Sequence, residues 1–197
     1  MRCFIGVELP EDVVELVGRV RDSLSLADHD WRSEKWVPAE NLHLTLAFLG
    51  EVTDSQLQRT ISALDRIEFP AYILENAAFV AVPAAGRARV CWLEFAGGAS
   101  SCALLSAKIV GELLASGVPV EVSGTGFRAH VTLVRSRRGR AVTNEALRVV
   151  QHALDDGAAP SVSVSSVTLF ASRLTRARPV YEVVAKIPLA EPEQHAL

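Results

Sequence analysis

This 197-residue chain has little cysteine, no long apolar run and no strong net charge. Its three cysteines, Cys3, Cys91 and Cys102, form an odd set without C-x-x-C spacing. That pattern argues against a disulfide framework or a cysteine zinc site and favours a reducing compartment. The apolar start of the chain is too short for a signal peptide, and no segment reaches the length of a membrane span. We therefore expect a cytoplasmic protein that does not enter membranes.

The low net charge of −3 provides no overall attraction to nucleic acid. Positive charge is nevertheless concentrated locally, because Arg135, Arg137, Arg138 and Arg140 follow one another closely. The last three fit a solvated loop as well as a contact to substrate, and the sequence leaves that choice open. Apolar residues make up 49% of the chain and charged residues 22%, as in ordinary soluble globular proteins. The length allows one domain of two lobes or two small domains.

One short pattern occurs twice, as His43-Leu44-Thr45-Leu46 and as His130-Val131-Thr132-Leu133. In an extended strand, side chains two positions apart point to the same face. Each copy would therefore present an imidazole beside a hydroxyl, with the aliphatic residues on the opposite face. Two such pairs facing one cleft would supply two proton-transfer groups and two hydrogen-bonding hydroxyls. That set is suited to splitting a phosphate ester without a metal ion.

The residues after each copy also correspond. Apolar residues at helical spacing predict helices over residues 54–67 and 144–156, with Asp54 and either Asn144 or Thr143 as N-caps. A β-prone run follows each helix, over residues 71–82 and 161–171, and then an arginine-rich turn and a further strand. A strand over residues 2–8 and a helix opened by Pro10 precede the first copy. The order strand–helix–strand–strand predicts an internal duplication with pseudo-two-fold symmetry.

This order of elements predicts an α+β fold of two lobes. We expect residues 1–187 to form a single bilobal domain and residues 188–197, which contain Pro192 and two glutamates, to form a frayed tail. Three further histidines do not belong to the repeated pattern. His29 falls in a polar loop, His152 on the second predicted helix and His195 in the tail, so we expect all three to be structural or surface residues.

Other chemistries fit these residues less well. A hydroxyl is a poor zinc ligand, and no Cys, Asp or second His follows either His at a ligand spacing, so we expect no metal. No nucleophile-elbow motif is present for a Ser-His-Asp triad. Acid–base catalysis by two imidazoles is the economical alternative, since an unperturbed His titrates near pH 6.5. Thr45 and Thr132 are also compatible with an ordinary role in strands.

The residues around both copies resemble a known family. Residues 41–52 and 127–135 are similar to the two motifs of the two-histidine (2H) phosphoesterase superfamily, and most similar to the RNA 2′,3′-cyclic phosphodiesterases, also called 2′-5′ RNA ligases. Residues 2–10 resemble the first strand of that family and residues 169–172 a late one, so the resemblance extends to about residue 187. The chain departs from the family at Ala129, where Pro is common, and at Val134, where a small residue is frequent.

The resemblance implies two pseudo-symmetric antiparallel-sheet lobes with outer helices and a central cleft. It also implies hydrolysis of an RNA terminal 2′,3′-cyclic phosphate to a 2′-phosphate without a cofactor. His43 would protonate the departing O3′, and His130 would activate water. The pseudo-symmetry makes the reverse assignment physically reasonable.

Three kinds of ligand contact are also implied by the resemblance. Arg135 would clamp the phosphate, Thr45 and Thr132 would hold its non-bridging oxygens, and the Phe48 ring would stack on the terminal base. The expected partners are therefore RNA ends or nucleotides with a cyclic phosphate, bound by a monomer. Alternatives are the same chemistry on a small cyclic-phosphate nucleotide, 2′-5′ RNA ligation, or a non-catalytic protein that binds RNA ends.

Overall fold

The computed structural model describes residues 1–121, 126–156, 161–175 and 178–191, and their strands form one nine-stranded sheet. The strands are β1 (Arg2–Glu8), β2 (Lys35–Trp36), β3 (His43–Glu51), β4 (Tyr72–Val82), β5 (Ala88–Gly97), β6 (His130–Arg140), β7 (Val162–Val164), β8 (Ser166–Leu174) and β9 (Pro179–Pro188). The α-helices are α1 (Glu11–Ala27), α2 (Asp54–Leu64), α3 (Ala99–Ala115) and α4 (Asn144–Asp155). Short 3-10 helices are η1 (His29–Ser33), η2 (Ala39–Asn41) and η3 (Ala85–Arg87).

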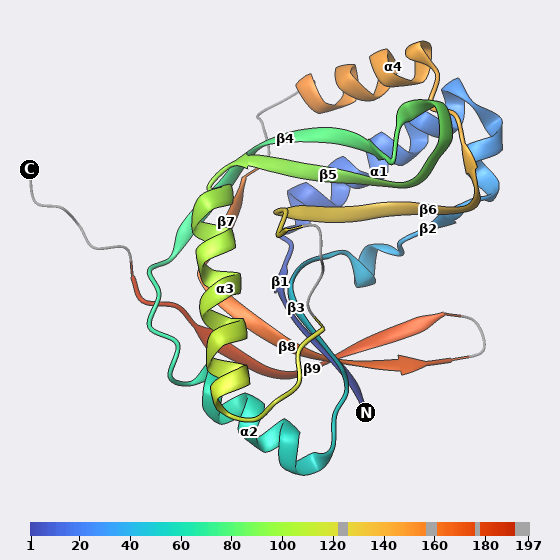
Figure 1. Cartoon of the computed structure of the whole chain (residues 1–197). Coiled ribbons are helices and arrows are strands. Elements are labelled where there is room, and N and C mark those ends of the chain that lie inside the picture. The colour runs from blue at the N-terminus through green and yellow to red at the C-terminus, as the bar shows by residue number, and fades with distance from the viewer. Residues whose placement is uncertain (122–125, 157–160, 176–177, 192–197) are drawn as a thin grey trace, which may run out of the picture.

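The sheet is antiparallel and curls into two lobes (Figure 1). The strand order is β7-β4-β5-β6-β3-β1-β8-β9, and the short β2 also pairs with β6. Between β6 and β3 the paired residues are Leu44 and Val131. We call β3, β1, β8 and β9 the first lobe and β6, β5, β4 and β7 the second lobe. Each lobe therefore contributes its innermost strand, and each innermost strand begins with one of the repeated histidines, as the predicted bilobal α+β fold requires.

The two lobes do not coincide with the two halves of the sequence. The β4–β5 hairpin follows the first motif in the chain, but β5 pairs with β6, which carries the second motif. Likewise β8 follows the second motif but pairs with β1 in the first lobe. The predicted halves are thus interleaved, because a strand pairs where its hydrogen bonds and apolar face are satisfied rather than with its nearest neighbour in sequence.

Strand β3 carries a β-bulge within its motif. Thr45 pairs with Gly6 and Ala47 with Ile5, so Leu46 is an extra residue without a partner on β1. The carbonyl of Leu46 instead accepts a hydrogen bond of 2.6 Å from the hydroxyl of Ser106 on α3. A bulge shifts the alternation of side chains by one position. As a result, Phe48 lies on the same face of the sheet as the motif's His and Thr.

Strand β6 carries the same bulge at the equivalent position. Thr132 pairs with Trp92 and Val134 with Cys91, so Leu133 is the extra residue. Its carbonyl accepts a hydrogen bond of 2.8 Å from the backbone N–H of Val37, which follows β2. Arg135 is consequently turned to the face that carries His130. The matching bulges support the predicted pseudo-two-fold relation between the two motif strands.

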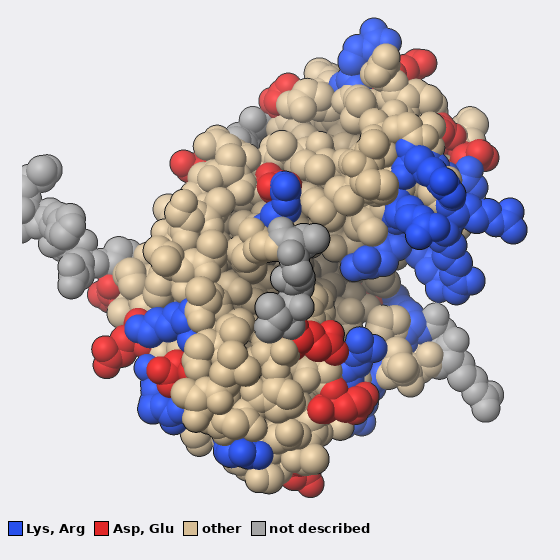
Figure 2. Space-filling view, in the orientation of Figure 1, with Lys and Arg blue, Asp and Glu red and all other residues tan. Residues whose placement is uncertain are grey.

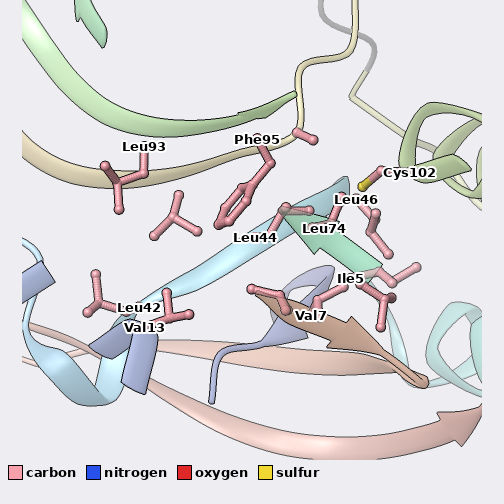
Figure 3. Packing of buried hydrophobic residues seen from close by; sticks show 14 of the residues in the cluster. Ile5, Val7, Val13, Leu42, Leu44, Leu46, Leu74, Leu93, Phe95 and Cys102 are labelled. Carbon is pink, nitrogen blue, oxygen red and sulfur yellow. The ribbon is translucent and has the colours of Figure 1, made fainter. Parts of the chain in front are cut away.

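The apolar residues of both motifs lie on the opposite face, in a single core. Leu44 and Leu46 pack there with side chains from β1, β4, β5, α1 and α3, as Figure 3 shows for Ile5, Leu74 and Phe95 among others. Helix α1 packs against α4, and α2 packs against α3. The helices thus pack along the core, to which each of the four α-helices contributes buried residues. None of the helices in the described part of the chain combines the length and apolar character needed to cross a bilayer.

Several predicted boundaries differ from the structure. Helix α2 ends at Leu64 rather than near residue 67, and the run predicted over residues 161–171 forms two strands, β7 and β8, which pair with β4 and β1 respectively. The N-cap of α2 is Thr53 rather than Asp54, because Thr53 and Gln56 form a reciprocal capping box; α4 is capped by Thr143. The tail begins later than residue 188, since Leu189 is buried and the N–H of Ala190 donates to the carbonyl of Phe69 at 3.0 Å. Residues 192–197, including His195, lie outside the described part of the chain.

Candidate active site

His43 is the first residue of β3 and is held from behind by the backbone. Its Nδ1–H donates to the carbonyl of Asn41 at 2.7 Å, which leaves Nε2 for the open face of the sheet. A backbone carbonyl can only accept, so this hydrogen bond selects the Nδ1–H tautomer. Asn41 is itself buried, and its side-chain amide donates to the carbonyl of Pro179 at 2.8 Å. The ring of His43 is therefore held by Asn41, which is itself fixed to the start of β9.

Aromatic rings surround His43 and leave it half-buried. Its ring centroid lies 4.6 Å from that of Phe4 and 5.3 Å from that of Tyr181, which meets it edge-on. This burial lowers the pKa of His43, and the positive charges of His130 and Arg135 lower the pKa further. The hydrogen bond to Asn41 acts in the opposite direction. Burial also raises the pKa of Tyr181. His43 is thus kept preferentially neutral in the free protein.

His130 has the same arrangement at the start of β6. Its Nδ1–H donates to the carbonyl of Arg128 at 2.9 Å, so Nε2 is again the nitrogen left for the open face. Its ring packs on Trp92, with centroids 4.7 Å apart. Glu94 fixes Trp92 and Arg128, because it accepts hydrogen bonds from the indole N–H of Trp92 at 3.1 Å and from the guanidinium of Arg128 at 3.0 Å. Each imidazole is therefore anchored through Nδ1 to the residue two positions before it.

All six predicted site positions line one cavity of about 540 Å³ between the lobes. They are His43, Thr45, Phe48, His130, Thr132 and Arg135. Phe48 is 46% exposed, so its ring has a free surface within the cavity. Within the described part of the chain, neither threonine hydroxyl hydrogen-bonds to another residue and Arg135 forms no ion pair. Two imidazoles, two hydroxyls and one guanidinium are therefore available to the same ligand.

The remaining arginines of the predicted cluster lie on β6 rather than in a loop. Arg137 and Arg138 are exposed and do not line this cavity. Arg140 forms ion pairs with Asp30, at 2.6 Å, and with Glu34. These pairs attach the end of β6 to η1 and to the residue before β2, so Arg140 has a structural role.

The two other histidines in the described part of the chain are separate from this cavity. His29 and His152 are exposed on η1 and α4, in agreement with a surface role. Among the described residues, no group of three or more His, Cys, Asp or Glu side chains is placed to hold a metal ion. The three cysteines are buried and free of disulfides.

Four contributors were not predicted from the sequence. Tyr181 packs on His43 and Trp92 on His130, Asn41 positions His43, and Glu94 accepts a hydrogen bond from Trp92. Asn41 and Arg128 each stand two residues before a His, which is a repeated spacing that could have marked them. Tyr181 and Trp92 come from other strands, and no local spacing connects them to either motif.

The lowered pKa of His43 predicts a specific dependence of stability on pH. Below about pH 6.5 the unfolded chain binds a proton at this residue while the folded chain excludes it, so stability falls as the pH drops. His43→Gln should therefore lose less free energy of unfolding between about pH 7.5 and about pH 5.5 than the wild type. Urea unfolding at both pH values measures this difference, with His152→Gln on exposed α4 as the control. Equal pH dependence in wild type and His43→Gln would contradict the inferred burial.

Comparison with known proteins extends these observations. Residues 7–92 match a family described as LigT-like phosphoesterase. A protein of Aeropyrum pernix named RNA 2′,3′-cyclic phosphodiesterase is 32% identical over 178 residues, which cover 90% of this chain and 97% of that protein.

Solved structures agree over nearly the whole length. LigT of Escherichia coli in its apo form has a TM-score of 0.69 and 26% identity, covering 96% of this chain and 97% of its own. That protein has also been crystallised with phosphate and with 3′-AMP. The protein TT0787 of Thermus thermophilus has a TM-score of 0.71 and 26% identity, covering 98% of this chain and all of its own. From the matched sequence, the shared fold and the paired motifs, we conclude that this chain belongs to the LigT-like phosphoesterase family.

Proposed function

We propose that this enzyme hydrolyses the 2′,3′-cyclic phosphate at RNA ends to a 2′-phosphate by two-histidine acid–base catalysis without a metal ion. The observation that carries the proposal is the pair of imidazoles anchored through Nδ1, with Nε2 of each left for one cavity. The name of the Aeropyrum pernix relative supports the substrate class, and the 3′-AMP complex of E. coli LigT supports a nucleotide ligand.

In the proposed reaction, His130 takes a proton from water as the water oxygen attacks phosphorus. The P–O3′ bond breaks, and His43 gives a proton to O3′, so that one water is consumed and a 2′-phosphate with a free 3′-hydroxyl is formed. Arg135 stabilises the negative charge that grows on the phosphate oxygens. Thr45 and Thr132 donate to the non-bridging oxygens, and Phe48 stacks on the terminal base.

The environment of His43 adds a requirement to this scheme. Burial lowers its pKa, so the neutral form is favoured in the free protein. An acid must carry its proton, and the anionic phosphate of the bound substrate supplies the opposite charge that favours the imidazolium. Substrate binding therefore prepares His43 for proton donation in this scheme. The monomeric state and the cytoplasmic location stay predictions.

An RNA oligonucleotide ending in a 2′,3′-cyclic phosphate tests the function directly. After removal of metal ions and with EDTA present, we expect full turnover to a product that has gained one water and carries a 2′-phosphate. Mass spectrometry measures the first property and ³¹P NMR the second. The double variant His43→Asn/His130→Asn is the control for contaminating nucleases.

Two results would contradict parts of this proposal. Activity that is lost in EDTA and restored by a divalent cation would contradict the metal-free mechanism. A 3′-phosphate product would show that the P–O2′ bond breaks, so that O2′ and not O3′ is the leaving group.

A further inference from the structure

A second and larger cavity, of about 870 Å³, opens beside the catalytic one. It is bordered by α1, η1, β2 and the start of β9, and we call it the side groove. Val37, Asn41, Arg135 and Tyr181 line both cavities. The side groove is therefore continuous with the proposed active site, and the two meet at the phosphate-binding arginine and the tyrosine that packs on His43.

The side groove is mainly cationic. Arg21, Arg32, Lys35, Arg135 and Arg178 line it, against the carboxylates of Asp22 and Glu34. Asp22 pairs with Arg21, Glu34 with Arg140 and Arg178 with Glu40, so the positive charge left in the groove is that of Arg32, Lys35 and Arg135. Arg32 and Lys35 form no ion pair with another described residue, and both are exposed. Figure 2 shows Lys and Arg gathered at the right-hand side, over β6 and its neighbours and beside the hollow between the lobes.

Aromatic surface accompanies this charge. Trp36 lines the groove and is only half-buried, while its indole N–H donates to the carbonyl of Trp31 at 2.8 Å. That hydrogen bond and packing against the core fix the ring, and its exposed part lies in the groove. Tyr181 stands at the junction with the active site. Cations that follow a backbone, together with rings on which bases stack, are the usual combination for binding a single nucleic-acid strand.

We propose that the side groove binds the nucleotides that precede the terminal one, so that the enzyme prefers an RNA strand to a mononucleotide. This inference rests on the proposed function. A 2′,3′-cyclic phosphate occupies the last nucleotide of its strand, so the strand can continue from the active site only through the 5′ side of that nucleotide. Arg32 and Lys35 then contact the preceding phosphates, and Trp36 stacks on a preceding base.

The test compares two substrates with the same terminal base, a 2′,3′-cyclic mononucleotide and a hexanucleotide with that end. The groove variant is Arg32→Gln/Lys35→Gln. Its matched control is Arg59→Gln/Arg148→Gln, which removes the same charge from exposed positions outside both cavities. We expect the groove variant to lose about tenfold or more in kcat/KM on the hexanucleotide and nothing on the mononucleotide. For the groove variant on the hexanucleotide, the slope of log kcat/KM against log salt concentration should become shallower by about two.

Binding is measured separately, so that this inference and the proposed function can fail independently. A fluorescent hexanucleotide ending in a 2′-phosphate reports binding without turnover, and we expect the groove variant alone to weaken it. If the groove variant binds more weakly but the wild type turns over neither substrate, the side groove binds RNA as inferred and the proposed hydrolysis is contradicted. Turnover with equal kcat/KM on both substrates in the wild type, or equal losses in the groove and control variants, would overturn the groove.

Discussion

Replacing either His43 or His130 by Asn is expected to lower kcat for cyclic-phosphate hydrolysis by about 10²–10⁴-fold. Asn is chosen because its amide can still donate to the carbonyl that accepts from Nδ1, at Asn41 or at Arg128. The substitution therefore removes the proton-transferring Nε2 and little else. Steady-state kinetics measures the loss, and unfolding curves check that stability is retained. Robust turnover by either single variant would exclude the two-histidine mechanism.

The same two variants also separate the acid from the base. A nitrophenyl phosphodiester has a leaving group that departs without a proton. If His43 is the acid, His43→Asn should hydrolyse this substrate at nearly the wild-type rate, while His130→Asn should stay slow. The opposite result would exchange the two roles, which the pseudo-two-fold arrangement of the site permits. Losses should not add in the double variant, because the two groups act in one step.

Replacing Arg135 by Gln is expected to lower kcat by about 10²–10³-fold, the usual cost of removing a group that stabilises transition-state charge. Arg135 lines the cavity and pairs with no described carboxylate, so its charge is available to the phosphate. Arg135→Lys should recover part of the rate, since it restores the charge but not the two-pronged hydrogen bonding.

The control for this prediction is Arg137→Gln, on the same strand but outside the cavity. It removes the same charge two residues further along β6 and should leave kcat nearly unchanged. If Arg135→Gln raises KM and leaves kcat unchanged, Arg135 contributes to ground-state binding rather than to stabilisation of the transition state. Equal losses for the two variants would indicate that only the general positive potential of this side matters.

Much of the site could be predicted from the sequence because it depends on local periodicity. A His and a Thr two positions apart face the same way in any extended strand, so the sequence places His43 with Thr45 and His130 with Thr132, and both pairs line the cavity. The strand–helix order around each copy was predictable for the same reason, since apolar spacing determines which face of a helix or strand is buried.

The faces of Phe48 and Arg135 could not be derived in this way. Each stands five residues after a His, and in a regular strand that odd spacing turns a side chain to the core face. Only the family resemblance indicated their roles. They reach the cavity because bulges at Leu46 and Leu133 shift the alternation by one position.

The sequence by itself determined the two motif strands, the amphipathic helices beside them and the side chains that each His-x-Thr pair exposes. Tertiary structure decided the rest, because it depends on partners distant in the chain. The carbonyls of the two bulged leucines are satisfied by Ser106 and by the N–H of Val37. The hairpins exchange lobes because β5, from the first half of the chain, pairs with β6 of the second half, and β8, from the second half, pairs with β1 of the first half. These long-range hydrogen bonds turn two similar sequence segments into the two sides of one cavity.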